Sequence, residues 1–229
     1  MARPGGRLRR GHPRAALRAR ALARPVSAPD DSARVEEIAA AIQAGEVVAI
    51  PTDTVYGLAA LPDDEAALRA LAELKGRPEG QPFAVLFDNF EAIRASVEEP
   101  DALDALDPFW PGPLTAVVRA ARSSPHAFVE PAVTPEGTIG LRMPDDAIAL
   151  AVIRACGGAL AVTSANLSGE PPAESAAEAA AMFGDALPIL DGGPRRRPPS
   201  TVIDLTARPP AVLREGPIDP AALLAALEG

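Results

Sequence analysis

The sequence predicts a mixed α/β fold, in which helices pack against a twisted sheet of parallel and antiparallel strands. Short apolar runs such as VVAI and FAVLF alternate with stretches whose apolar residues recur at helical spacing, and this alternation is typical of a sheet covered by helices. Other apolar runs, as in residues 115–120 and 138–143, follow one another with no helical stretch between them. This second observation indicates that part of the sheet is antiparallel.

Helical spacing and capping residues predict the helices. Residues 32–44 place apolar side chains on one face, and Ser32 is the expected N-cap. Residues 63–75 do the same, with Asp63 or Asp64 as the N-cap. Shorter helices are expected at about 89–96, 100–106, 146–155, 175–183 and 219–228.

Apolar runs bounded by Pro, Gly or polar residues predict the strands. Residues 51–58 and 108–115 are too rich in turn-forming residues for regular structure, so we expect loops there. The strands are expected at 47–50, 83–87, 115–120, 138–143, 159–164, 187–190, 200–205 and 212–215.

The charge of the chain is unevenly distributed. Residues 1–29 hold eight of the 22 basic residues and no acidic residue, so the remainder carries 14 basic residues against 31 acidic ones. The basic segment is interpreted as a disordered tail, an extension from an over-long reading frame, or a transit peptide. Residues 30–229 are expected to form a single domain. Because this remainder of the chain is so acidic, we expect it to bind the nucleic-acid backbone poorly.

Two classes of protein are excluded by composition. No apolar run approaches the roughly 20 residues that a membrane-spanning helix needs, so we expect no membrane association. The single cysteine, Cys156, excludes an intramolecular disulfide and a cysteine-rich zinc site. We interpret Cys156 as a small apolar residue at a helix end.

Lys75 is the only lysine in a chain with 21 arginines. It lies two residues before Arg77, past the end of a predicted helix, and we expect both on exposed cleft walls. The two cations can simply pair with the helix dipole. Alternatively they form a phosphate clamp, with Lys75 as a compact charge and Arg77 as a planar fork.

Three further motifs place polar residues where strands end. PTDTVYGL (51–58) puts two hydroxyls and a carboxylate in one turn, and TSANLSG (163–169) puts three hydroxyls beside Asn166. Thr138 and Arg142 stand four residues apart on one strand, and therefore on the same face. Each motif taken alone is also explained by a strand cap or a side-chain turn.

The order and spacing of these motifs, from PTDTVYGL through LKGRP, FWPGPLT, TIGLRMP, TSANLSGEPP and STVID to LREG, resemble the YrdC-like family of threonylcarbamoyl-AMP (L-threonylcarbamoyladenylate) synthases. The likeness spans residues 36–216, and its most specific positions are Lys75, Arg77, Ser164 and Asn166. It implies a cytoplasmic nucleotidyltransferase with a three-layer fold and a deep, positively charged cleft.

The resemblance also implies roles for individual residues. Lys75, Arg77 and Arg142 are expected to be catalytic. Positions 86 and 172 depart from the family pattern, because Leu86 and Pro172 stand where other members offer polar contacts. The threonine ligands are expected to be Thr54, Arg142, Val162 and Ser200. The ATP ligands are expected to be Lys75, Arg77, Gln81, Thr138, Ser164, Asn166, Pro172 and Arg214.

The implied substrates are ATP, L-threonine and bicarbonate. Mg²⁺ is expected on the phosphates of ATP, with Asp53 as a candidate water-mediated ligand, while the metal ligands as a set are not predicted. The product is expected to pass to a tRNA threonylcarbamoyl-transferase complex. Loop 191–199, with its three arginines, either closes over ATP or is a solvated charge run.

Two alternatives stay open at the level of sequence. One is a divergent relative of the same fold with another carbamoyl-adenylate activity. The other is an RNA-binding module, although an aromatic content of 3% provides few surfaces on which bases could stack. We therefore expect weak or no direct binding of nucleic acid.

Removal of residues 1–29 is expected to leave the activity intact, because the predicted elements begin after this segment. The measurement compares turnover and the yield of folded protein for the full and shortened chains. A large loss of folded protein on truncation would show that the segment is structural.

Overall fold

The computed structural model describes residues 31–77, 81–184 and 187–228, so the predicted basic tail lies outside the described residues. Within these residues one eight-stranded sheet has the order β1-β2-β6-β3-β5-β4-β7-β8. The strands are β1 (Val48–Ile50), β2 (Gly57–Ala60), β3 (Ala84–Phe87), β4 (Leu114–Arg119), β5 (Thr138–Arg142), β6 (Ala159–Ser164), β7 (Thr201–Asp204) and β8 (Ala211–Arg214). The helices are α1 (Asp31–Gln43), α2 (Glu65–Lys75), α3 (Phe90–Ala95), the 3₁₀ helix η1 (Pro100–Phe109), α4 (Ala147–Ala155), α5 (Ala176–Phe183) and α6 (Pro220–Glu228).

The sheet is mixed, as the sequence predicts. β3 pairs with β5 and β4 pairs with β7 in parallel, whereas the other neighbouring strands pair antiparallel. In the antiparallel pairs β4–β5 and β7–β8, two predicted strands follow each other without a helix between them. The prediction of a mixed α/β fold is therefore confirmed.

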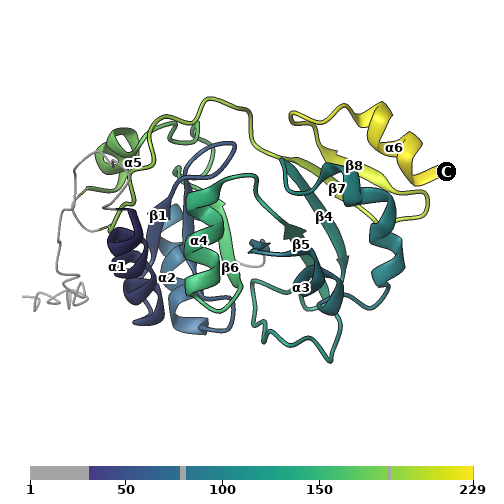
Figure 1. Ribbon diagram of the computed structural model, residues 1–229, viewed down its shortest axis with the longest axis horizontal. Coiled ribbons are helices and arrows are strands. Elements are labelled where there is room, and N and C mark those ends of the chain that lie inside the picture. Colours follow the sequence, from purple (N-terminus) through teal and green to yellow (C-terminus); the bar gives the residue numbers. More distant parts are fainter. Residues whose placement is uncertain (1–30, 78–80, 185–186, 229) are drawn as a thin grey trace, which may run out of the picture.

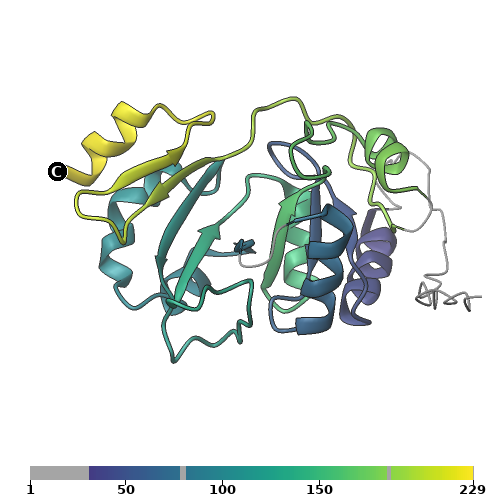
Figure 2. The same cartoon turned by 180° about the vertical axis from the view of Figure 1, so that it is seen from behind.

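Helices cover both faces of the sheet, which gives three layers (Figures 1 and 2). On one face α1 and α4 pack against each other and against β1, β3 and β6. Their buried residues include Ile38, Ile42, Val152 and Ile153. The opposite face is covered by α2, α3, η1 and α6, whose buried residues include Leu68, Leu71, Ile93, Leu103, Leu106 and Leu223.

The period of two along each strand separates the core from the cleft. In β3 and β5, Val85 and Leu141 face the larger core, while their neighbours Leu86 and Arg142 face the other side. β4 follows the same rule, since Ala116 is in the core and Thr115 lines the cleft. One face of the central strands is therefore apolar packing, and the other face carries the polar side chains of the site.

Capping residues define the ends of the helices. Asp64 accepts hydrogen bonds from two backbone amides at the start of α2, and Asp146 does the same at the start of α4. α2 ends at Gly76, whose φ of 62° is left-handed. The expected N-cap Ser32 is wrong, because α1 begins one residue earlier and Ser32 lies inside it.

Two predictions about strands are wrong. Residues 187–190 do not form a sheet strand, because only Ile189 bridges to Ala49. Conversely, Gly57–Ala60 forms β2 between β1 and β6, a strand that was not predicted, because residues 57–58 were expected to belong to a turn. The turn-like motif overlaps the start of this strand. Gly57 packs closely against β6, because a Cβ atom at this position would lie 2.6 Å from Val162 Cγ1.

Gly57→Ala is expected to lower the free energy of unfolding by about 1–3 kcal/mol, because the added methyl overlaps the Val162 side chain in a packed sheet. Urea unfolding of the single variants and of the double variant with Val162→Ala measures the coupling between them. The double variant should recover part of the loss. Purely additive effects would mean that the contact with Val162 is not the cause.

Candidate active site

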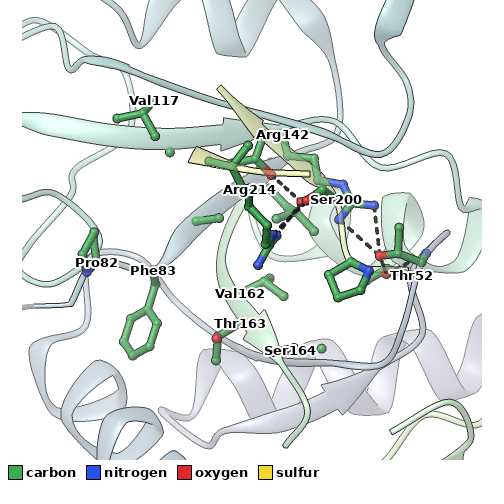
Figure 3. Close-up of a pocket in the computed structure, with 18 of the residues that line it drawn as sticks. Thr52, Pro82, Phe83, Val117, Arg142, Val162, Thr163, Ser164, Ser200 and Arg214 are labelled. Carbon is green, nitrogen blue, oxygen red and sulfur yellow. Dashed lines mark hydrogen bonds between the residues drawn. The ribbon is translucent and has the colours of Figure 1, made fainter. Parts of the chain in front are cut away.

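A cleft of about 300 Å³ lies on the face of the sheet opposite the larger core. Its walls come from the loop before β2, from the segment before β3, from alternate positions of β3, β4 and β5, and from residues of β6, β7 and β8. Figure 3 shows Arg142, Arg214 and Ser200 on one side of this space and Val162, Thr163 and Ser164 on the other. Segments far apart in the sequence thus meet at a single site.

The cleft is basic, although the chain carries a net charge of −9. Arg77, Arg142 and Arg214 line it, and among the described residues no Asp or Glu does so. Hydroxyl groups supply most of the other polar lining, from Thr52, Thr54, Thr115, Thr134, Thr138, Thr163, Ser164 and Ser200. The predicted deep, positively charged cleft is therefore present, as a local cluster in an acidic body.

Arg77 reaches from the end of α2 across to β6. Its guanidinium donates to Thr163 Oγ1 at 3.1 Å and to the Pro82 carbonyl at 2.9 Å, and its Cζ lies 5.1 Å from the centroid of the Phe83 ring. Burial, and then the charge of Arg214, lower the pKa of Arg77 from its ordinary value. These contacts hold a planar cation at the cleft wall without a carboxylate partner among the described residues.

Arg142 is the most buried of the three arginines. Its guanidinium pairs with Asp53 and donates to Thr54 Oγ1 at 3.3 Å and to the Gly112 carbonyl at 3.2 Å. Burial lowers the pKa of Arg142, whereas the neighbouring Asp53 raises it. The side chain thereby connects the loop before β2 with the loop before β4.

Arg214 and Ser200 form a second cluster on β8 and at the start of β7. Arg214 Nη2 donates to Ser200 Oγ at 3.0 Å, and Arg214 Nε donates to the Ser200 carbonyl at 2.9 Å. Ser200 Oγ also lies 2.9 Å from Thr115 Oγ1. The resemblance did not point to Thr115, but a hydroxyl in an otherwise apolar strand was a usable signal for it.

Lys75 is 6% exposed and does not line the cleft, so the expectation of an exposed wall position is wrong for it. Its ammonium lies within 3.3 Å of four oxygens, the backbone and side-chain oxygens of Ser164 and Asn166. Burial, and then Arg77, lower the pKa of Lys75 to about 8. The lone lysine therefore supports the S-x-N loop from behind.

Asn166 completes this arrangement. Its amide nitrogen donates to the carbonyls of Leu167 and Glu170, which fixes its oxygen toward Lys75. Ser164 donates its proton to the same amide oxygen at 2.6 Å. Lys75, Ser164 and Asn166 are thus joined in one network, whereas Arg77 bonds to Thr163 and Pro82. Of the four K-x-R and S-x-N residues, only Arg77 and Ser164 line the cleft.

The structure brings most of the predicted ligands together. The cleft is lined by Thr54, Arg77, Thr138, Arg142, Val162, Ser164, Ser200 and Arg214, and also by Leu86. Four predicted ATP ligands, Lys75, Gln81, Asn166 and Pro172, are not part of its lining. Lys75 and Asn166 are buried behind it, while Gln81 is exposed and Pro172 is half-buried.

Loop 191–199 is anchored beside the cleft. Tyr56 Oη donates to the Gly193 carbonyl at 2.9 Å and accepts from the Gly192 amide. Arg195 forms an ion pair of 2.8 Å with Asp146. The interpretation of this loop as a wholly solvated charge run is therefore wrong for Arg195.

Asp53 has no access to the cleft as a metal ligand, because its carboxylate is buried against Arg142. In the ranges 31–77, 81–184 and 187–228, no three His, Cys, Asp or Glu residues are grouped closely enough to hold a metal ion. No helix in the same ranges is long and apolar enough to cross a membrane.

Three arginines and a set of hydroxyls suit the handling of a polyanion such as a nucleotide triphosphate by positioning and charge neutralisation. Fold and site together define an α/β protein with a cleft suited to binding anions. Residues 40–216 match the family model Sua5_yciO_yrdC, described as "Telomere recombination". The chain belongs to this Sua5/YciO/YrdC family.

Relatives with curated names support this assignment. The chain is 40% identical over 168 residues to the threonylcarbamoyl-AMP synthase of Thiobacillus denitrificans, a match that covers 72% of this chain and 87% of the relative. It is 42% identical over 181 residues to that of Pyrococcus abyssi, covering 76% of this chain and 52% of the relative. The chain thus spans about half the length of the archaeal relative.

A solved structure shows the same architecture. The crystal structure of P. abyssi Sua5 complexed with L-threonine matches with a TM-score of 0.76 and 36% identity, over 85% of this chain and 57% of that one. The chain is therefore a homologue of threonylcarbamoyl-AMP synthases.

Lys75→Met is expected to lower the free energy of unfolding by about 1–3 kcal/mol at pH 7, because buried oxygens of Ser164 and Asn166 lose their donor. The pKa of Lys75 falls from 10.5 to about 8 on folding, so the unfolded chain binds the proton more tightly. Wild-type stability should therefore rise relative to the non-titrating variant as pH rises from 8 to 10.5.

Urea unfolding of the wild-type protein and of Lys75→Met at several pH values measures the difference between their free energies of unfolding. Groups that titrate in the same way in the two proteins do not contribute to this difference. A stability difference that shrinks as the pH rises would contradict the assignment of the lowered pKa to Lys75.

Proposed function

We propose that this chain makes threonylcarbamoyl-AMP and pyrophosphate from L-threonine, bicarbonate or CO2, and ATP. The observation that carries the proposal is the convergence of Arg77, Arg142 and Arg214 on one cleft that also holds eight Ser and Thr hydroxyls. Such a site can neutralise a triphosphate and orient a small polar substrate beside it. One domain, residues 30–229, would carry the reaction.

The threonine subsite is proposed around Thr54, Arg142, Val162 and Ser200. Arg142 would use its remaining N–H group for a carboxylate, because its hydrogen bonds to Gly112, Thr54 and Asp53 occupy four of its five donors. Leu86 lines the same cleft where a polar residue is expected in the family, so it would give apolar contact to the substrate. Substrate choice then depends on the hydroxyls.

The ATP subsite is proposed around Arg77, Thr138, Ser164 and Arg214. Arg77 and Arg214 influence each other electrostatically, since the charge of Arg214 lowers the pKa of Arg77. Two cations without carboxylate partners are suited to the phosphates of one polyanion. Lys75 and Asn166 would act from behind by holding Ser164, while Gln81 and Pro172 would contact ATP only at the edge of the cleft.

The chemistry needs no protein nucleophile. The threonine amine adds to CO2 and loses a proton, which gives a carbamate. A carbamate oxygen then attacks the α-phosphorus of ATP in line, the bond to the bridging oxygen breaks, and pyrophosphate leaves. Arg77 and Arg214 would neutralise the charge that develops on the phosphates, and Arg142 would hold the threonine carboxylate.

Mg²⁺ would enter the cleft bound to ATP, as part of the substrate. The described walls fit this arrangement and not a resident metal site, because their polar groups are hydroxyls and guanidiniums and their nearest carboxylate, Asp53, is paired with Arg142. When bound, the ion would supply charge neutralisation at the phosphates.

The product is a reactive mixed anhydride, and we propose that it passes to a tRNA threonylcarbamoyl-transferase complex in the cytoplasm. The cleft itself offers little to RNA, since Tyr56 and Phe83 are the aromatic residues in its lining and both are fully or almost fully buried. A divergent relative acting on another amine remains the competing function, and the next experiment distinguishes the two.

The deciding experiment measures pyrophosphate release from ATP with bicarbonate, with and without L-threonine, and with L-serine as the matched control. We expect release that depends on threonine and is much weaker with serine. ATP binding without any threonine dependence in well-folded protein would favour the divergent relative.

Arg77→Ala is expected to lower the rate of pyrophosphate release at least about 100-fold, because it removes a fixed cation from the developing charge. Arg69→Ala, at an exposed arginine of α2, the helix that precedes Arg77, is the matched control and should keep the wild-type rate. An Arg77 variant that is as active as this control would mean that the phosphates lie elsewhere.

A further inference from the structure

Asp53 is a buried carboxylate that the proposed chemistry leaves unused. The residue is 8% exposed and is not part of the cleft lining. Its Oδ1 accepts a hydrogen bond from Arg142 Nη2, while its Oδ2 is buried without a hydrogen-bond partner in the described structure. Asp53 can therefore act on a ligand in the cleft only through Arg142.

The pairing fixes the orientation of the Arg142 guanidinium. Thr54 Oγ1, in the same turn as Asp53, also accepts hydrogen bonds from the Arg142 guanidinium. The Gly112 carbonyl, in the loop before β4, accepts another from Arg142 Nε. Any rotation that gave up Asp53 would leave a buried carboxylate unpaired, which costs several-fold more than the loss of a neutral hydrogen bond. The remaining N–H of Arg142 therefore points in one direction.

The pairing also makes the charge of the cleft uneven. Of the three arginines that line it, Arg142 has a carboxylate within 4 Å, and Arg77 and Arg214 have none in the described part of the chain. Uncompensated cations attract a polyanion much more strongly than a neutralised pair does. The charge of Arg142 is therefore largely neutralised by Asp53, whereas Arg77 and Arg214 keep theirs.

We propose that Asp53 is a positioning residue that decides which substrate Arg142 receives. It orients the guanidinium for the single carboxylate of an amino acid, and it cancels the charge that would otherwise draw triphosphate or pyrophosphate onto Arg142. The phosphates are thereby left to Arg77 and Arg214, and the amino-acid carboxylate is left to Arg142. This inference rests on the proposed function and names how its site distinguishes its two substrates.

Asp53→Asn tests the proposal, because asparagine keeps the shape and one acceptor but removes the charge. Calorimetric titration with L-threonine and, separately, with inorganic pyrophosphate gives the two affinities. We expect the Kd for threonine to rise about tenfold or more, and the Kd for pyrophosphate to stay the same or fall. In turnover, the KM for threonine should rise and the KM for ATP should not.

Asp88→Asn is the matched control, because it makes the same charge change in another ion pair, with Arg154, outside the cleft lining. It should leave both affinities at the wild-type values. Asp53→Glu restores the charge and should recover part of the threonine affinity. Equal weakening of both ligands by Asp53→Asn, with a lowered unfolding midpoint, would show a merely structural role and overturn the proposal.

A measurement on the wild-type protein keeps the proposal testable if Asp53→Asn does not fold. Threonine is titrated with and without saturating pyrophosphate, and the Kd for threonine should not rise. Competition between the two would overturn the inference while leaving the proposed function intact. Failure of the wild-type protein to bind threonine at all would instead overturn the proposed function, and this inference with it.

Discussion

A buried guanidinium at the end of β5 is the interaction on which the geometry of the cleft depends. Arg142 is 6% exposed, and a cation removed so far from water needs partners for its charge and its donors. It finds them in Asp53 and Thr54 on one loop and in Gly112 on another. These loops precede β2 and β4, which lie in different halves of the sheet. The hydrogen bonds and the ion pair of Arg142 therefore also fix the distance across the cleft.

The alternation of side chains along the strands explains how one sheet can be both a core and a binding surface. The central strands bury Val85, Ala116 and Leu141 on one face, so the opposite face is available for polar groups. There the lining uses hydroxyls and guanidiniums and avoids carboxylates. A protein with a net charge of −9 can thereby maintain a locally positive site, because short-range charges dominate over the distant surface.

The positions of the motif residues in the structure agree with the sequence-based predictions in some cases and differ in others. Sequence reasoning predicted that Thr138 and Arg142 share a face, because period two on a strand requires it, and both line the cleft. It failed for Lys75, because a residue at a helix end can point toward solvent or into a neighbouring loop, and the sequence contains nothing that decides between them. It also missed β2, because the polar turn at 51–58 overlaps the start of this strand, where Gly57 permits close contact with β6.

By itself the sequence determined the mixed α/β class, most of the helices and strands, and the set of polar residues that matter, because periodicity, capping and strand-end motifs are local properties of the chain. Only the tertiary structure decided which of those residues face the cleft and which support it from behind. Asp53, Lys75 and Asn166 belong to the second group. The reason is that burial and charge pairing arise between segments up to about 90 residues apart, as for Lys75 with Asn166 and Arg142 with Asp53, and only folding brings them together.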